Sequence, residues 1–461
     1  MSAVTQQRAA RPGAHRGASA SGSPMPVDTV ARVVLAAIAV GALAVVAIWW
    51  KNTLGVVGLD QWLTNAGRIT GLLAGYTAPV LLLLMARIPL LEREVGSDRL
   101  ARWHAMGGRY LVGLIATHVV TIIWGYALTA RKNVIGEGVT MVLTYPDMLK
   151  ASFGTLLLLA TGFFSARAAR KRLGYDTWYY LHLATYVAVA LGFAHQLSNG
   201  ADLGEGPERL LWYGLYLGTA AVIGWYRLLR PWQLDRRHQL RVAEVRPEGP
   251  GTVSLFLTGR HLDELGAEAG QFFRLQFLAK GLRFAANPYS LSAPPTRDYL
   301  RFTVKDLGGH SAAVAGVKPG TKVRAEGPYG AFTARRRRSR QVLLLAAGVG
   351  ITPLRALFET LPAAPGELTL LYRASAEEDL LFRRELTAIA EARGARLQFL
   401  LGRRSEVGNP IQPTVLRNLV PGLAAHDVYV CGPEAFMEQA VTALRQARVP
   451  RHRIHHESFS F

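Results

Sequence analysis

The sequence is poor in cysteine and in acidic residues. Its 461 residues include one cysteine, Cys431, so the chain cannot form an internal disulfide or a cysteine-ligated zinc or iron–sulfur centre. A bound metal would have to be held by histidine. The 32 acidic residues stand against 53 lysines and arginines, which gives a formal net charge of +21. No nucleic-acid-binding motif, no calcium-binding hand and no basic surface interleaved with aromatic residues occurs, so this charge does not indicate a nucleic-acid-binding protein.

Long hydrophobic runs are abundant in the first half of the chain. Half of all residues are hydrophobic, and six apolar runs have about the 17–25 residues that a bilayer-crossing helix needs. The predicted spans are Val30–Trp50, Thr70–Ala86, Trp103–Leu128, Met148–Phe164, Tyr175–Leu197 and Leu210–Leu229. We therefore expect a six-helix, all-α transmembrane bundle over residues 28–231. Residues 1–27 are typical of a disordered basic tail, and no cleavage site follows that would indicate a signal peptide.

The distribution of arginine and lysine predicts the orientation of this bundle. Basic residues gather after the second, fourth and sixth spans, whereas the opposite connections carry few. By the positive-inside rule, the N-terminal tail and everything after residue 231 lie in the cytoplasm. We therefore expect a multi-pass protein of the cytoplasmic membrane that has membrane lipid as a partner.

Two of the predicted spans each carry two histidines. His104 and His118 lie in the third span, and His182 and His195 lie in the fifth. Ionisable side chains inside a bilayer are costly and usually mark a functional site. The two spacings, 14 and 13 residues, correspond to about 20 Å along a helix, so we expect His104 to face His182 and His118 to face His195.

Each facing pair can hold one b-type haem by bis-histidine ligation. Thirteen residues leave the two histidines of the fifth span about 140° apart on its surface, so we expect either a distortion of that helix or ligands that reach around it. The alternative is that the histidines are interhelical hydrogen-bond donors. Arg68, at the outer start of the second span, either snorkels to the interface or pairs with a propionate of the outer haem or a reduced acceptor.

After Pro231 the pattern changes to alternating polar and apolar residues separated by Gly/Pro turns, which predicts a small antiparallel β-barrel over 232–337. Three motifs in it suit a flavin dinucleotide, because an aromatic ring can lie against the flavin, a hydroxyl can bond its N5 edge, and glycine amides can approach a pyrophosphate. The expected FAD-binding residues are Pro288, Tyr289, Ser290, Ser292, Gly308, Gly309, His310 and Ser311, with a further glycine motif at 327–330.

Residues 338–461 alternate strands and helices, which predicts a doubly wound parallel α/β sheet. Gly348 and Gly350, followed by Thr352 and Pro353, stand between the first strand and the first helix, where a dinucleotide pyrophosphate meets backbone amides. At the end of the second strand, Arg373 with Ser375 favours a 2′-phosphate and hence NADPH. Arg403 and Arg404 follow the third strand and either assist or are plain surface charge.

These motifs together resemble the ferric reductase/NADPH oxidase superfamily over residues 30–461. The family's histidine pattern matches the four histidines, its flavin motif matches Pro288, Tyr289 and Ser290, and its NADPH-site glycines match Gly348 and Gly350. The resemblance implies that Cys431, Gly432 and Pro433 lie beside the nicotinamide and that a terminal aromatic covers the flavin. Glu457, Phe459 and Phe461 are the candidates for that end, with Phe459 preferred.

One residue departs from the family pattern. Asn287 stands where the family has Arg or His, so the FAD pyrophosphate lacks a charged partner unless Arg283 or His310 supplies one.

The sequence therefore predicts an NAD(P)H-dependent oxidoreductase. NADPH gives a hydride to FAD in the cytoplasm, and single electrons pass through two haems to an external acceptor, either ferric iron or dioxygen. Two alternatives stay open. In one, the chain is a membrane-anchored flavin reductase serving a quinone or a protein partner. In the other, it is a haem-bearing sensor or assembly subunit without turnover.

Overall fold

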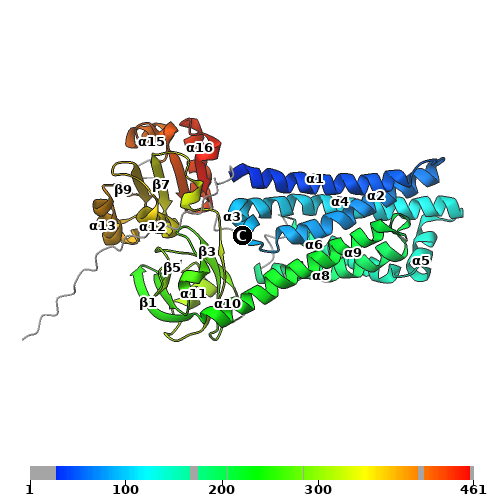
Figure 1. The fold of residues 1–461 in the computed structure, drawn as a ribbon, viewed down its shortest axis with the longest axis horizontal. Coiled ribbons are helices and arrows are strands. Elements are labelled where there is room, and N and C mark those ends of the chain that lie inside the picture. The colour runs from blue at the N-terminus through cyan, green and yellow to red at the C-terminus, as the bar shows by residue number, and fades with distance from the viewer. Residues whose placement is uncertain (1–26, 167–174, 205, 284, 403–409, 457–461) are drawn as a thin grey trace, which may run out of the picture.

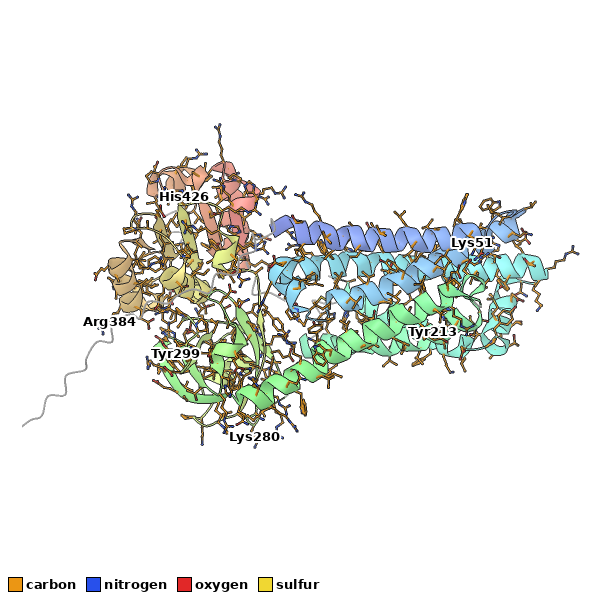
Figure 2. All side chains as sticks on the ribbon, viewed as in Figure 1. Lys51, Tyr213, Lys280, Tyr299, Arg384 and His426 are labelled. Atoms are coloured by element: carbon orange, nitrogen blue, oxygen red, sulfur yellow. The ribbon has the colours of Figure 1, made fainter. Side chains whose placement is uncertain are left out.

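The computed structural model describes residues 27–456 apart from 167–174, 205, 284 and 403–409. Figure 1 shows a long helical bundle beside two compact modules, one of antiparallel strands and one of mixed strands and helices. In Figure 2, Lys51 lies at the end of the bundle remote from the modules, while Tyr299, Arg384 and His426 lie on the modules.

Each of the six predicted spans coincides with a long helix. The bundle consists of α1 (Val27–Lys51), α2 (Leu59–Leu84), α3 (Pro89–Glu94), α4 (Ser97–Ala130), α5 (Val134–Thr144), α6 (Met148–Ser165), α8 (Tyr175–Ser198) and α9 (Pro207–Ile223). Among the described residues, α1, α2, α4 and α6 are long and apolar enough to cross a membrane. The structure thus supports a membrane-spanning bundle with four such helices, and the count of six spans stays a prediction.

The predicted start of the second span is wrong, because α2 begins at Leu59 and not at Thr70. The polar first turns of α2 are helical because their side chains find partners inside the bundle. The Trp49 indole donates to the Asn65 carbonyl (3.0 Å), and Asn65 donates to the Gln61 carbonyl (2.9 Å). Hydropathy alone could not detect a helix start whose polar residues form hydrogen bonds within α2 and with α1.

The last helix of the bundle continues into the modules. After α9 the backbone forms a π-helical turn over Gly224–Leu229 and then α10 (Arg230–His238). Pro231 lies at the start of α10, directly after the π-helical turn, where the backbone already departs from the regular i→i−4 hydrogen-bond pattern because the Arg230 N–H bonds to the Trp225 carbonyl. α10 ends at His238, and the next residue, Gln239, adopts the left-handed conformation.

The first module contains two antiparallel sheets, ordered β1-β2-β5 and β4-β3-β6. Its strands are β1 (Arg241–Gly249), β2 (Thr252–Thr258), β3 (Phe272–Phe277), β4 (Asn287–Ser290), β5 (Leu300–Lys305) and β6 (Val323–Tyr329), with the short helix α11 (His310–Val314). Isolated bridges Arg241↔Lys322 and Leu291↔Phe302 join the sheet edges. Leu255, Leu275 and Phe302 fill the space between the sheets. The antiparallel module is as predicted, and its closure into a barrel stays a prediction.

The second module is a five-stranded parallel sheet in the order β11-β10-β7-β8-β9. Its elements are β7 (Val342–Ala347), α12 (Ile351–Thr360), β8 (Leu368–Arg373), α13 (Arg383–Arg393), β9 (Arg396–Leu400), α15 (Pro413–Leu419), β10 (Asp427–Cys431), α16 (Glu434–Gln446) and β11 (Ile454–His456). Leu344 and its neighbours pack with α12 and α13, while Leu343 and its neighbours pack with α15 and α16. Helices therefore cover both faces, as a doubly wound fold requires.

The sequence pattern predicts a helix over Asp379–Ala392, and this predicted start is wrong, since α13 begins at Arg383. Leu380 and Leu381 turn into the core, and Phe382 adopts a left-handed conformation (φ 60°). Burial of these apolar side chains overrides the helical propensity of the segment.

Candidate functional site

The four histidines lie in two facing pairs between α4 and α8. The ring centroids of His104 and His182 are 5.8 Å apart, and those of His118 and His195 are 6.4 Å apart. The pairing expected from the sequence is therefore the one observed. The His104–His182 pair lies nearer the start of α4, the end of the bundle that adjoins the modules in Figure 1.

The spacing within each pair suits a metal held between two imidazoles. A metal–nitrogen bond is about 2 Å long and an imidazole nitrogen lies about 1 Å from its ring centre, so two axial imidazoles hold their centroids about 6 Å apart. Within the described residues, no group of three or more His, Cys, Asp or Glu side chains converges as a metal site. The pairs fit a centre in which the protein gives two axial ligands and a macrocycle gives the others.

Hydrogen bonds select the imidazole nitrogen that each histidine can offer. The Nδ1–H groups of His104, His118 and His195 donate to the carbonyls of Leu81 (3.1 Å), Gly67 (2.8 Å) and Gly192 (2.5 Å). A carbonyl only accepts, so Nδ1 carries the proton and Nε2 has a lone pair that it can offer to a metal. His182 Nδ1 lies 3.3 Å from the Ser165 hydroxyl, and the Trp178 ring stacks on His182 at 5.1 Å.

The angular offset on the fifth span is resolved by the side chains. Because α8 is α-helical from Tyr175 to Ser198, the expected distortion of the helix is wrong. The two histidine side chains instead leave the helix in different directions, and their role as ligands stays a prediction. His195 turns back onto the carbonyl of its own helix at Gly192, whereas His182 turns toward Ser165 of α6.

Glycines let α2 and α4 approach closely at both histidine levels. A Cβ added at Gly71 would lie 2.6 Å from His118 Nδ1, and one at Gly107 would lie 2.6 Å from Leu81 Cδ2. Small residues at helix contacts permit such close packing in membranes. The α2 carbonyls that orient His104 and His118 are within reach because of this approach.

Arg68 lies inside α2 rather than at the start of a span. Its Nε donates to Asp202 Oδ2 (2.9 Å), a second nitrogen contacts Asp202 Oδ1, and a third donates to Asn65 Oδ1 (2.8 Å). Asp202 is 5% exposed and lies in the connection between α8 and α9. The buried Asp202 carboxylate balances the charge of Arg68. The predicted pairing of Arg68 with a propionate or a reduced acceptor stays a prediction.

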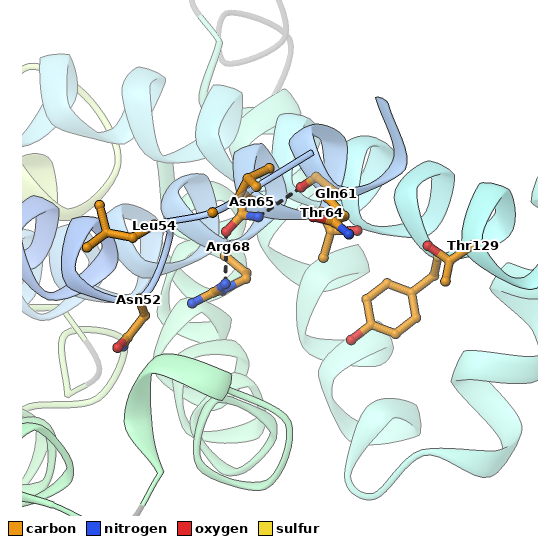
Figure 3. A pocket seen from close by; sticks show the side chains of 10 residues that line it. Asn52, Leu54, Gln61, Thr64, Asn65, Arg68 and Thr129 are labelled. Atoms are coloured by element: carbon orange, nitrogen blue, oxygen red, sulfur yellow. Dashed lines mark hydrogen bonds between the residues drawn. The ribbon is translucent and has the colours of Figure 1, made fainter. Parts of the chain in front are cut away.

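A cavity of about 370 Å³ adjoins Arg68 at the end of the bundle remote from the modules. Figure 3 shows Arg68 and Asn65 close together on α2, with Thr129 on the opposite wall. The lining is formed by Asn52, Leu54, Gly55, Val56, Gln61, Thr64, Asn65, Arg68, Tyr126 and Thr129. Amides and hydroxyls dominate this list, so the cavity is polar and carries no unbalanced cation from Arg68.

The predicted flavin motif forms the edge strand β4. Ser290 is 4% exposed, and its hydroxyl has no hydrogen-bond partner among the described residues. A buried hydroxyl without a partner is costly, so this atom fits a ligand group that completes it. Burial raises the pKa of the half-buried Tyr289, and a hydrogen bond with Asn287 opposes this shift. Pro288 pairs with Arg274 on β3, and Arg274 donates to the Ala286 carbonyl (3.1 Å).

Arg274 is a cation beside the flavin strand that the sequence interpretation did not consider. It lies on the strand next to the motif, whereas Arg283 and His310 were expected to compensate for Asn287. An ion pair with Glu326 (3.4 Å) balances its charge.

The side chains of two other predicted flavin-binding residues form hydrogen bonds within the module. Ser292 accepts a hydrogen bond from Thr303 (2.8 Å) and is fully buried. Ser311 accepts from the Leu307 amide (2.8 Å) and donates to the Gly308 carbonyl (2.8 Å). Gly308 and Gly309 have positive φ, and a Cβ at either would meet no atom within 4 Å. This glycine turn, which precedes His310 at the start of α11, therefore presents open backbone.

The predicted dinucleotide glycines lie at the carboxyl edge of the parallel sheet. Gly348 (φ 53°) begins a 3-10 turn that leads into α12, and Gly350 packs so tightly against the Cys431–Gly432 backbone that a Cβ would overlap it. Thr352 donates to the Val349 carbonyl (3.0 Å) and is buried like Pro353. The ends of β7 and β10, which carry the two predicted motifs, are thus adjacent.

Cys431 lies at this edge, but its side chain is fully buried in the apolar cluster beneath α12. Pro433 immediately precedes α16. Arg373 ends β8 and donates to the Leu400 carbonyl (3.3 Å), while Ser375 is exposed beyond it. Burial lowers the pKa of the Arg373 guanidinium. Arg373 is thus on the same sheet edge as Gly348.

Several predicted residues lie outside the described part of the chain. They are Arg403, Arg404, Glu457, Phe459 and Phe461.

Sequence reasoning missed the ion-pair cluster between the two modules. Arg301 on β5 pairs with Glu385 on α13 (2.8 Å), and Arg355 on α12 pairs with the same carboxylate (2.9 Å). Burial raises the pKa of Glu385, but the two guanidiniums lower it further, to below its usual value. Isolated charges in a strand and two helices gave no signal that they meet.

Comparisons with known proteins agree with this architecture. Residues 70–193 match the family described as "Ferric reductase like transmembrane component", and residues 344–442 match "Oxidoreductase NAD-binding domain". The ferredoxin reductase component of 3-ketosteroid-9-alpha-monooxygenase from Mycolicibacterium smegmatis is 32% identical over 231 residues, 48% of this chain and 65% of the relative. A flavohemoprotein from Xylella fastidiosa is 25% identical over 269 residues, 56% of this chain and 65% of the relative. The chain thus spans less than two thirds of the length of either relative.

A solved structure, the FAD/NAD-binding domain of nitric oxide dioxygenase from Vibrio cholerae, is 25% identical, with a TM-score of 0.41, and the match covers 48% of this chain and 98% of that one. The first match runs from within α2 to within α8, and the second runs from β7 into α16 and leaves out only the strand β11 of the parallel sheet. The chain therefore contains one region similar to a ferric reductase like transmembrane component and a second region similar to an oxidoreductase NAD-binding domain.

Proposed function

We propose that this protein transfers electrons across a membrane, from cytoplasmic NADPH through FAD and two b-type haems to an external acceptor. The observation that carries the proposal is the pair of imidazole pairs, with centroids 5.8 and 6.4 Å apart. Structural histidines that served only as hydrogen-bond donors would have no reason to face one another at two levels of the same two helices.

Four histidines would hold the two haems, and their order along α4 supports a direction. His104 and His182 lie nearer the modules, and His118 and His195 lie about 20 Å further along the helices. When bound, the haems would supply one-electron carriers at two depths. The carbonyls of α2 and α8 that accept from His104, His118 and His195 would orient these imidazoles toward the haems.

The modules suit a hydride donor and a flavin. Ser290 and Tyr289 would face the flavin, and the turn at Gly348 and Gly350 would receive the NADPH pyrophosphate, with Arg373 near its 2′-phosphate. FAD, when bound, supplies the conversion between a two-electron donor and one-electron acceptors. The identity of the module as an NAD-binding oxidoreductase domain supports this assignment.

The polar cavity beside Arg68 supports an acceptor site at the outer end. Arg68 follows Gly67, whose carbonyl accepts from the outer ligand His118. Ferric iron and dioxygen are both acceptors that such an opening would serve. The basic connections on the module side support a cytoplasmic location of the modules in the cytoplasmic membrane.

Substitution of the outer ligand tests the proposal. We expect His118→Ala to lower the haem content from two per chain to one and to abolish reduction of an external acceptor. NADPH-dependent flavin reduction should be unchanged, because the module is remote from His118. His261→Ala, at an exposed position of the first module, is the control and should keep both haems. Unchanged haem content in His118→Ala would refute the ligand assignment, and a purified protein without a haem Soret band would favour a membrane-anchored flavin reductase.

A further inference from the structure

The loop between α2 and α4 carries a buried charge cluster that contacts the first module. The Arg87 guanidinium lies over the Tyr329 ring, 5.1 Å from its centroid, and pairs with Glu92 at 3.0 Å. The side chains of Arg87 and Glu92 are 13% and 3% exposed. Tyr329 ends β6 and is 5% exposed. Both sides of this contact are therefore withdrawn from solvent.

The protonation states of Arg87 and Tyr329 are fixed. Burial lowers the pKa of Arg87, but the Glu92 carboxylate and its neighbours raise it above the ordinary value. Burial and the nearby Glu326 carboxylate raise the pKa of Tyr329 to about 12. The Ser97 hydroxyl donates to the second Glu92 oxygen. A cationic guanidinium over a neutral ring thus persists at any physiological pH.

Tyr329 stands in a single row with the flavin motif. Phe272 on β3 pairs with Ser290 on one side and with Tyr329 on the other. Two strand spacings separate Ser290 from Tyr329, about 10 Å across the sheet. On the membrane side, Arg87 follows six residues after Leu81, whose carbonyl orients His104. The Arg87–Tyr329 contact therefore lies between the sheet that contains the flavin strand and the helix end that contacts His104.

Other contacts near the Arg87–Tyr329 pair also join the membrane domain to the module. Arg336 donates to the Glu94 carbonyl (3.2 Å), and Arg227, at the end of the last bundle helix, lies 3.9 Å from Glu326. A Cβ at Gly96 would lie 3.7 Å from Ala331. The loop is therefore docked along the end of β6 and the residues that follow it.

Stability alone does not account for a buried ion pair at this place. Desolvation of two charges offsets much of their attraction, and apolar residues of similar size would often be as stable. A directional contact of this kind instead fixes the position of the first module relative to the membrane domain. We propose that the Arg87–Tyr329 contact positions the flavin strand against the inner histidine pair and thereby sets the rate of electron transfer from the module to the membrane domain. This inference rests on the proposed function.

Anaerobic stopped-flow mixing with NADPH tests it, because flavin bleaching and the haem Soret band are followed in one reaction. We expect Arg87→Gln and Tyr329→Leu to slow haem reduction by about tenfold or more, because small misplacements of reacting groups have effects of this size. Flavin bleaching and haem content should stay at wild-type values. Tyr329→Phe keeps the aromatic ring and should show the wild-type rate of haem reduction. Arg87→Lys keeps the charge and takes the place of Arg87→Gln if the glutamine variant fails to fold.

Arg335→Gln is the control, since that arginine is 66% exposed and pairs with Glu268 on the surface. Wild-type haem reduction in both Arg87→Gln and Tyr329→Leu would overturn the inference. A parallel loss of flavin bleaching would also overturn it, because the contact would then be merely structural. If the wild-type protein bleaches its flavin but never reduces a haem, the proposed function itself is refuted.

Discussion

Replacement of Gly71 by alanine would test the outer histidine pair without removing a ligand. Gly71 lies on α2, and a Cβ there would come within 2.6 Å of Nδ1 and 2.8 Å of Cε1 of His118. Van der Waals contact needs about 3.5 Å, so the imidazole must retreat by about 0.9 Å or the helices must separate. Metal–ligand distances tolerate only about 0.2 Å. Unless the helices separate, the His118 ring therefore cannot both avoid the methyl group and keep a bond to a metal.

The cost to the fold should be small compared with the effect on the site. Alanine gains about 1 kcal/mol of helix propensity over glycine, and overpacking costs about 1–3 kcal/mol. The net loss of stability is thus about 0–2 kcal/mol. We expect purified Gly71→Ala to fold, to lose the outer haem or shift its absorption and midpoint potential, and to reduce an external acceptor poorly.

The assays are haem content per chain, a redox titration and thermal unfolding. Gly113→Ala on α4 is the matched control, because a Cβ at Gly113 meets no atom within 4 Å. That variant should keep both haems and gain stability. Two haems with unshifted spectra and potentials in Gly71→Ala would refute the argument that His118 is an axial ligand held against α2.

Three further outcomes are expected. Arg373→Gln should raise KM for NADPH about tenfold and leave KM for NADH unchanged, since one charge-assisted contact to phosphate is worth about 1.5–3 kcal/mol. Steady-state kinetics with NADPH and with NADH measures both values, and an equal rise of the two KM values would contradict the prediction. Asp202→Asn should leave the Arg68 cation unbalanced and raise the midpoint potential of the outer haem relative to that of the inner haem. An unshifted midpoint potential of the outer haem would argue against a position of Arg68 close to that haem. The α/β module should lose stability on acidification, because burial lowers the pKa of His455 below 6.5 and, although burial raises the pKa of Asp427, hydrogen bonds from His455 and two backbone amides bring it below 3.8. The folded module then binds fewer protons than the unfolded chain, so its unfolding temperature should be constant above about pH 6.5 and fall below it; a constant value down to pH 4 would contradict this.

Much of the site was predictable because its signals are local. Histidines at matched spacings on two apolar segments predicted both facing pairs, and alternation of polar and apolar residues predicted the antiparallel module in which Tyr289 and Ser290 lie. Glycines after a buried strand predicted the turn at Gly348, since only a strand–turn–helix unit brings backbone amides to a phosphate in this way.

What could not be predicted depends on contacts between distant parts of the chain. The partner of Arg68 is Asp202, 134 residues away, and no periodicity indicates such a meeting. The polar start of α2 is helical only because Asn65 is satisfied by neighbours. Similarly, the motif around Gly327 was interpreted as a flavin contact, whereas its Tyr329 packs under Arg87 from the membrane domain.

The most direct test of the central claim is the haem stoichiometry and reducibility of the purified protein. A pyridine haemochrome assay should give two b-type haems per chain, and NADPH under anaerobic conditions should reduce both with low-spin, bis-histidine spectra. A protein that binds FAD and oxidises NADPH but contains no haem would contradict the account, since the four histidines would then have no iron to hold.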